Sequence, residues 1–281
     1  MSAMKPLMFC AVILVGSTAF AQDPKPDGPA PTPANPAPVS SPEKSESKPS
    51  DESGAKAKTK LTDPKEILTK ANEATDAVNV VSYKIDIRRL DTPKYHTNEM
   101  GGRVLMTDWD GEKPEKFLFH IEARPAGSSE VAETVVGSDG KQFYVISKKT
   151  KTAYVGNDPS ALGYYRMALR YFPMYEFVIP NPFQDEINAP KLDYLGVEKV
   201  EDVECVGVSV EYANQAQKAL WYFGNKDWLP RRVKRHMIDP EGASLNRQTT
   251  VTDIVVDPKL EEDAFAFKLP EGFTKVEGSA P

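Results

Sequence analysis

The residues that could serve as metal ligands or nucleophiles are few and lie far apart. The three histidines, His96, His120 and His236, stand at no ligand spacing from one another, so each is interpreted as an ordinary surface or core residue. Cys205 lies in an apolar, strand-like stretch without a neighbouring base, which favours a small strand residue over a thiolate nucleophile. We therefore expect neither a metal site nor a cofactor.

Carboxylates are more numerous, but their spacing forms no complete motif. Asp108-Trp109-Asp110-Gly111 begins like a calcium loop and lacks the remaining ligands, so we interpret it as a turn. The sequence also lacks a Gly-x-Ser-x-Gly elbow, a His-Glu-x-x-His motif and a phosphate-binding glycine loop. We expect a protein that is not an enzyme; the alternative requires carboxylates from separate segments to converge in one pocket.

The first 21 residues are typical of an export signal. Lys5 precedes an apolar run, and Ala19-Phe20-Ala21 supplies the small residues that predict cleavage between Ala21 and Gln22. An uncleaved signal acting as a weak anchor is the alternative. Cys10 would leave with the signal, so one cysteine remains and no intramolecular disulfide can form. The expected location is the periplasm or another exported compartment.

Composition separates a linker from a folded domain. Residues 22–60 are rich in Pro, Ser and Lys without apolar periodicity, which predicts a disordered linker that acts as a spacer or, alternatively, as a tether. Residues 61–277 are long enough to form one domain with a sizeable core. The net charge is -6 at pH 7 and no basic stripe is interleaved with aromatic residues, so nucleic acid is not an expected partner.

The domain begins with a helix and continues with strands. Asp63-Pro64-Lys65-Glu66 is a helix start, and an apolar stripe follows it. Val81, Tyr83, Ile85 and Ile87 then alternate with polar residues, which predicts a strand with one buried face. Similar patterns predict strands at 103–107, 116–123, 131–136, 142–146, 152–155, 192–200, 203–212, 219–223, 231–238, 248–255 and 263–269.

Two local features mark this succession of strands. Ser138-Asp139-Gly140-Lys141 separates two apolar runs and predicts a hairpin. Between the sixth and seventh predicted strands lies an apolar insertion that can start as a helix at Asp158-Pro159. Within it Leu162, Tyr165, Leu169 and Phe172 fall on one helical stripe, and Phe177 follows in a proline-rich, aromatic stretch.

The order of these elements resembles a known superfamily. A capped helix, an alternating first strand, the Ser138–Lys141 hairpin, the insertion and a closing Phe265-Ala266-Phe267-Lys268-Leu269-Pro270-Glu271-Gly272 are similar to periplasmic lipoprotein carriers of the LolA type and to LppX-like lipid carriers. The resemblance implies an α+β fold: a strongly curved antiparallel β half-barrel with an N-terminal helix and a helical lid insertion. In the carriers, an arginine before a Pro-x-x-Phe segment holds the lid, and Lys113 stands at the matching position here.

We expect an exported, non-catalytic protein that holds the acyl chains of a lipid or lipoprotein in a half-barrel cavity. The expected cavity residues are Tyr83, Ile85, Ile87, Val206, Val208 and Val210. The expected lid residues are Leu162, Tyr165, Leu169, Phe172 and Phe177, with Lys113 as the latch candidate. The protein is expected to be monomeric, with envelope membrane proteins as further partners. Two alternatives stay open: an envelope sensor that binds a protein or peptide, and a solid core without a ligand cavity.

Overall fold

The computed structural model describes residues 61–90, 99–107, 111, 115–124, 128–213, 217–238 and 244–281. The expected export signal, the expected linker, His96, Asp108 of the expected turn and the latch candidate Lys113 lie outside these ranges. Within the described ranges, no helix is long and apolar enough to cross a membrane.

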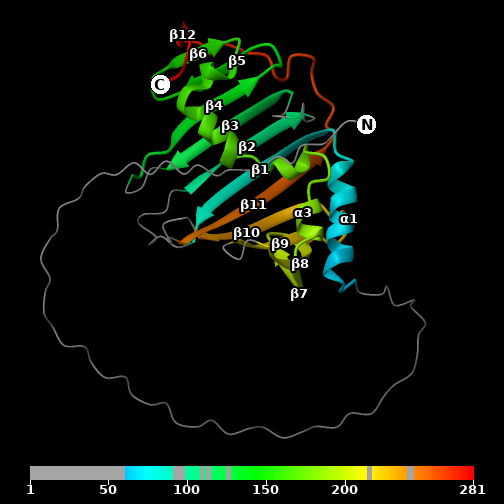
Figure 1. Ribbon diagram of the computed structural model, residues 1–281. Helices are drawn as coiled ribbons and strands as arrows, with labels where there is room; N and C mark the ends of the chain where they lie inside the picture. The colour runs from blue at the N-terminus through cyan, green and yellow to red at the C-terminus, as the bar shows by residue number, and fades with distance from the viewer. Residues whose placement is uncertain are drawn as a thin grey trace, which may run out of the picture. The chain divides into compact units, whose positions relative to one another are not determined.

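A curved, open sheet organises the described residues (Figure 1). Its twelve described strands lie in the order β12-β6-β5-β4-β3-β2-β1-β11-β10-β9-β8-β7, so the sheet has two edges and is not a closed barrel. All neighbouring pairs are antiparallel except β12 with β6. The strands are β1 (Val80–Arg89), β2 (Glu99–Thr107), β3 (Phe117–Arg124), β4 (Ala132–Ser138), β5 (Phe143–Ser147), β6 (Thr152–Gly156), β7 (Lys191–Val200), β8 (Val203–Glu211), β9 (Gln217–Gly224), β10 (Pro230–Ile238), β11 (Ser244–Val256) and β12 (Thr274–Glu277).

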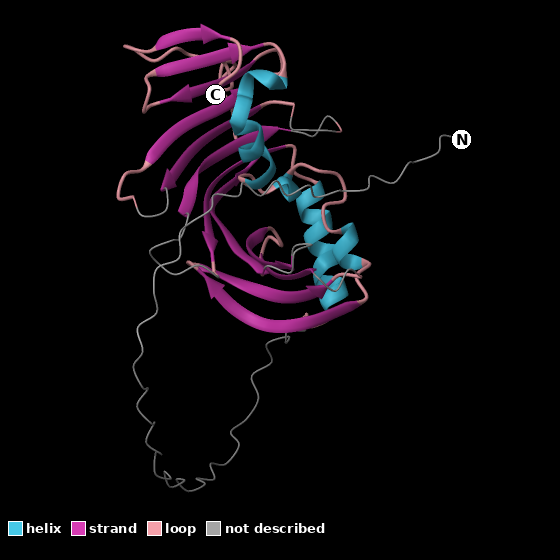
Figure 2. Cartoon of the chain, turned by 60° about the vertical axis from the view of Figure 1, so that its left-hand side comes forward, coloured by secondary structure: helices cyan, strands magenta, loops and turns pink. Residues whose placement is uncertain are grey.

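The alternation in the sequence sets which face of each strand is buried. In β1 the odd-numbered residues from Val81 to Ile87 are buried, as their spacing predicts. Figure 2 shows the sheet curving around the helices, which lie on its concave side. Gly102 in β2 allows a close approach of the β3 backbone, because its φ is 140° and a Cβ there would lie 1.8 Å from the carbonyl oxygen of His120.

The helix α1 (Pro64–Asp76) follows its expected start signal. The carboxylate of Asp63 accepts a hydrogen bond from the backbone N–H of Lys65, and Pro64 occupies the first turn, where no N–H partner is needed. Ile67, Leu68 and Ala71 are buried, because the apolar stripe faces the concave side of the sheet. The helix contacts β7 and β8 at one end of the sheet.

The insertion between β6 and β7 is made of short pieces rather than one helix. It contains η2 (Pro159–Tyr165), α2 (Arg166–Tyr171), η3 (Tyr175–Phe177) and α3 (Gln184–Ile187), and residues 159–187 are called the lid insertion below. Gly163, with φ 49° and ψ -131°, breaks the first helical stretch. The expected continuous stripe from Leu162 to Phe172 is therefore divided between two pieces, yet both of these side chains are fully buried.

The expected closing strand at 263–269 is wrong. Residues 262–266 form turns, and the last strand is β12 further along, which pairs in parallel with β6. The Tyr144 hydroxyl donates to the carbonyl oxygen of Phe265 (2.9 Å), and the rings of Tyr144 and Phe267 lie 5.4 Å apart. The segment thus packs against the outer face of the sheet, in a small cluster with Ile146 and Val155.

Candidate ligand-binding site

The concave face of the sheet is apolar from β3 to β8. The expected cavity residues Tyr83, Ile85, Ile87, Val206, Val208 and Val210 are all buried and belong to one cluster. They come from β1 and β8, which are separated in the sheet by β11, β10 and β9. The middle of the face is formed by residues that sequence reasoning missed, among them Val251, Val233 and Trp221. The alternation of Ala219, Trp221 and Phe223 in β9 was the signal that could have found them.

The lid insertion covers this face with aromatic side chains. The ring of Phe177 lies 5.1 Å from that of Tyr83, and the ring of Phe172 lies 5.9 Å from that of Phe119. Leu162 is fully buried, whereas Tyr165 and Leu169 are partly buried against the same cluster. All five expected lid residues thus contact the cluster that contains the expected cavity residues.

A further aromatic residue of the lid insertion, Phe183, was not among the five expected lid residues. Phe183 is fully buried and stands edge-on to Trp221 and Phe223, with ring centroids 5.0 and 5.1 Å apart. It follows Pro180 and Pro182, where the helical pattern had ended, so no periodicity marked it. Phe172, Phe177 and Phe183 of the lid insertion thus all pack against aromatic side chains of the concave face.

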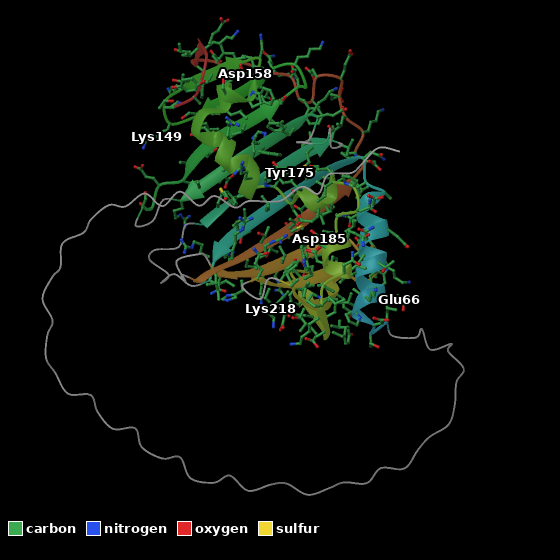
Figure 3. All side chains as sticks on the ribbon, viewed as in Figure 1. Glu66, Lys149, Asp158, Tyr175, Asp185 and Lys218 are labelled. Carbon is green, nitrogen blue, oxygen red and sulfur yellow. The ribbon has the colours of Figure 1, made fainter. Side chains whose placement is uncertain are left out.

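Hydrogen bonds hold the lid insertion to β1 and to α1. The hydroxyl of Tyr83 accepts from the backbone N–H of Met174 (2.7 Å), and burial raises the pKa of this hydroxyl well above its usual value. From α1, the carboxylate of Asp76 accepts from the N–H of Asn181 (2.7 Å), and the side-chain oxygen of Asn72 accepts from the N–H of Phe183 (3.0 Å). These contacts use side chains, because the lid insertion adds no strand to the sheet. Its Tyr175 and Asp185 are labelled in Figure 3.

Two arginines hold the lid insertion at one rim of the concave face. Arg235 in β10 forms an ion pair with Glu176 of η3 (2.5 Å), and its guanidinium also lies 5.0 Å from the centre of the Trp221 ring. Arg247 in β11 donates to the backbone carbonyl of Tyr171 at the end of α2 (2.6 Å). The side chain of Arg235 is 35% exposed and Arg247 is half-buried, so both guanidinium groups are at the edge between apolar core and solvent.

The two arginines are direct cross-strand neighbours. Arg235 is opposite Arg247 in the β10–β11 register, and Arg247 is in turn opposite Arg89 of β1. Burial and the charge of Arg235 lower the pKa of Arg247 to about 10, which leaves Arg247 charged at neutral pH. The rim therefore carries a row of positive charge on a chain whose net charge is negative.

A buried carboxyl lies close to this rim. The Tyr212 hydroxyl donates to Oε1 of Glu186 in α3 (2.6 Å). Burial raises the pKa of Glu186, which the hydrogen bond from Tyr212 and the charge of Arg235 oppose only in part. The neutral form of Glu186 is therefore favoured more than in water.

The other candidate residues that the structure describes do not gather into a site. Cys205 is buried in β8 on the outer face, where burial raises the pKa of its thiol to about 11. His120 lies on β3 and His236 on β10, where its Nδ1 contacts the side-chain oxygen of Asn246. In the part of the chain that the structure describes, no three His, Cys, Asp or Glu residues are placed to hold a metal ion.

A polar groove lies on the opposite, outer face of the sheet. It has a volume of about 570 Å³ and is lined mainly by charged and polar residues of β1, β2, β3 and β11, including Lys84, Asp86, Arg103 and Glu122. Ion pairs join Asp86 to Arg88 (2.7 Å) and Lys84 to Asp253 (2.6 Å). This groove has no apolar lining comparable to the concave face, so the two faces offer different kinds of surface.

Comparisons with known proteins identify a family and several similar folds. The model of the family described as "Predicted periplasmic protein (DUF2092)" matches residues 66–277. Among curated proteins, none matches the sequence. Similar solved structures include LprF from Mycobacterium bovis (11% identity, 72% of this chain and 97% of that chain, TM-score 0.45), lipoprotein LppX from Mycobacterium tuberculosis (9%, 70% and 96%, 0.38) and a LolA superfamily protein from Nitrosomonas europaea (12%, 74% and 99%, 0.33). At these identities the likeness to the solved structures concerns the fold alone.

Proposed function

Because the chain belongs to the DUF2092 family of predicted periplasmic proteins, we propose that it acts in the periplasm as a binding protein without catalytic activity. The proposed ligand is the acyl part of a lipid or lipoprotein. It lies on the concave face of the sheet, in the place that the lid insertion fills in this structure.

The observation that carries the proposal is the construction of the cover over the concave face. An extended apolar face that must be permanently buried is usually covered by a second sheet or by long helices. Here α1 covers only part of it, and the rest is covered by pieces of three to seven residues, which are held by side-chain hydrogen bonds and two arginines. Such a segment can leave the sheet without breaking a strand, because side-chain contacts and not strand pairing hold it to the sheet.

The energy available from an acyl chain is sufficient for such an exchange. Each buried methylene contributes about 0.8 kcal/mol, so a sixteen-carbon chain gains on the order of 10 kcal/mol before ordering costs. The chain would replace the rings of Phe172, Phe177 and Phe183 against Phe119, Tyr83 and Trp221. Ligand and lid insertion would thus compete for the same apolar surface, and loading becomes a shift between two packings.

The expected absence of catalysis belongs to the same proposal. A reaction centre needs a nucleophile or base near a group that stabilises charge. On the described concave face, the two arginines, Glu176, Glu186, Tyr83 and Tyr212 make hydrogen bonds or ion pairs that hold the lid insertion. These contacts support binding rather than bond cleavage.

The test is to purify the exported protein gently from a membrane-containing host and to analyse it by native mass spectrometry and lipid extraction. We expect acyl lipid at about one molecule per protein. The double variant Leu169→Glu/Phe172→Glu places charge in the lid insertion and should lose the lipid. Leu269→Glu is the matched control, because Leu269 is 46% exposed outside the lid insertion, and it should keep the lipid.

Circular dichroism establishes that each variant is folded before its lipid content is compared. Lipid-free wild-type protein that also fails to bind a fluorescent fatty acid would contradict the proposal. Lipid-free protein that instead binds a peptide partner would favour the alternative of an envelope sensor.

A further inference from the structure

We propose that the ligand of the concave face carries an anionic headgroup, a phosphate or carboxylate, which Arg235 and Arg247 bind at the rim. This inference rests on the proposed function and specifies the chemical class of its ligand. It follows from the placement of the two arginines and from the identity of their present partners.

The placement of the two arginines side by side costs stability unless acceptors contact them, as Glu176 and the carbonyl of Tyr171 do while the lid insertion is closed. Like charges directly opposite one another on neighbouring strands destabilise a sheet, and Arg235 and Arg247 are such a pair. Arg89 continues the row on the other side of Arg247. A guanidinium that faces inward at the rim of an apolar surface also loses hydration. An anion that contacts both groups offsets these costs.

Both arginines have partners that belong to the lid insertion. Glu176 is the carboxylate paired with Arg235. Arg247 donates to two neutral acceptors, the carbonyl of Tyr171 in the lid insertion and, at 3.4 Å, Oγ1 of Thr249 in its own strand. If the lid insertion moves away to admit an acyl chain, Glu176 and Tyr171 leave together, and of these contacts only the longer one with Thr249 stays. An anionic headgroup can take the place of these lost acceptors, since a guanidinium binds carboxylate and phosphate oxygens through two parallel N–H donors. The headgroup would replace Glu176 as the acyl chain replaces Phe177.

The surface beside the arginines changes from charged to apolar along the strands, as an anionic lipid does from headgroup to acyl chain. In the register of the sheet, the next inward row from Arg235 and Arg247 contains Val233 and Thr249, and the row beyond contains Val251. Positive charge therefore stands at one end of the strands and apolar surface continues along them. The carboxyl of Glu186 is near Arg235, and because burial favours its neutral form it opposes an incoming anion less than an ionised carboxylate would. Head and tail of an anionic amphiphile match this division.

The experiment compares two lipids that share their acyl chains. Delipidated, full-length exported protein is titrated with dioleoyl phosphatidylglycerol and with dioleoylglycerol, whose headgroup is an uncharged hydroxyl, and the two dissociation constants are compared. We expect the anionic lipid to bind about tenfold tighter or more, because a hydrogen bond to a charged group contributes more than one to a neutral group. The double variant Arg235→Gln/Arg247→Gln should lose this preference and still bind both lipids. Arg103→Gln, on the outer face, is the matched control and should retain it.

Each outcome decides the inference. Equal binding of the two lipids by wild-type protein overturns the anionic headgroup and leaves the proposed function intact. Binding of neither lipid refutes the proposed function itself. A folded Gln double variant that keeps the preference shows that the arginines only hold the lid insertion. Glycerol 3-phosphate that binds as tightly as phosphatidylglycerol would indicate a site for free phosphate and would also overturn it. The wild-type comparison needs no variant, so a variant that fails to fold leaves the test valid.

Discussion

Replacement of Phe177 by alanine is expected to destabilise the empty protein and to improve its affinity for acyl chains. Phe177 of the lid insertion is fully buried, and its ring packs against that of Tyr83 in β1. Truncation of a buried phenylalanine to alanine costs about 3–5 kcal/mol. In a domain of this size that corresponds to a fall of about 10 °C in the midpoint of thermal unfolding.

The same truncation leaves a cavity that an acyl chain can fill. Three methylenes in the place of the ring return about 2 kcal/mol, at about 0.8 kcal/mol each. Phe177→Ala also weakens the closed lid insertion that competes with the ligand, so we expect the dissociation constant for oleate to fall by about tenfold or more. Thermal unfolding by circular dichroism and titration with a fluorescent fatty acid measure the two effects on one protein sample.

The matched control is Ile146→Ala. Ile146 is buried in the cluster on the outer face, so its truncation should cost stability without tightening the binding of fatty acid. If Phe177→Ala loses stability and binds no more tightly than wild type, Phe177 is an ordinary core residue. The exchange between lid insertion and ligand would then be refuted, even if some lipid binds elsewhere.

Two further predictions concern the attachment of the lid insertion. Gly163→Ala should cost about 2 kcal/mol or more in urea unfolding, because φ is 49° and a Cβ would lie 1.7 Å from the carbonyl oxygen of Ala280. Gly196→Ala has a φ of 91° with open space, so an equal loss there would contradict the clash. Glu186→Gln should stabilise the protein at neutral pH. Burial raises the pKa of Glu186 above 4.5, so the folded state holds a proton that the unfolded state has lost, and stability falls as pH rises above 4.5. Glu186→Gln should remove this pH-dependent loss of stability. If urea unfolding of the variant and of the wild type depends on pH in the same way, the prediction is refuted.

Local signals predicted most elements of the fold because each depends on near neighbours. The start of α1 follows from Asp63 and Pro64, and the inward face of β1 follows from alternation. The turn at Asp139 also follows, since its carboxylate accepts from the N–H groups of Lys141 and Gln142 (both 2.9 Å). These interactions lie within a few residues, where sequence spacing is equivalent to spatial distance.

The closing segment was mispredicted because alternation of apolar residues does not by itself indicate a strand. Consecutive turns can also place every second side chain against one surface. Phe265 and Phe267 alternate, but the hydroxyl of Tyr144 holds a backbone carbonyl that a strand would need for its ladder. The strand β12 lacked any apolar period, because its four residues are exposed. Its parallel pairing with β6 is a long-range contact that no local pattern indicates.

The arginine pair was missed for a related reason, although a signal for it exists. Whether two residues on neighbouring strands face each other depends on register, which the turn between the strands sets. Arg235 and Arg247 are equally distant from residue 241, within the Asp239-Pro240-Glu241-Gly242 turn sequence. A symmetric hairpin about that turn would have placed them opposite each other, as the structure does.

The two halves of the proposed ligand can be tested separately, because they compete with different parts of the lid insertion. The acyl chain competes with aromatic rings such as that of Phe177, and the headgroup competes with Glu176 for Arg235. Weakening the ring contacts lowers the cost of opening, so it should raise the affinity for every acyl ligand by the same factor. Removing the arginines also releases the lid insertion, and it should therefore leave or improve the binding of a neutral lipid while it abolishes the preference for an anionic one. If the arginines only hold the lid insertion, their removal should leave or improve the binding of a neutral lipid without changing the preference for an anionic one. Loss of that preference therefore separates a headgroup site from a purely structural role.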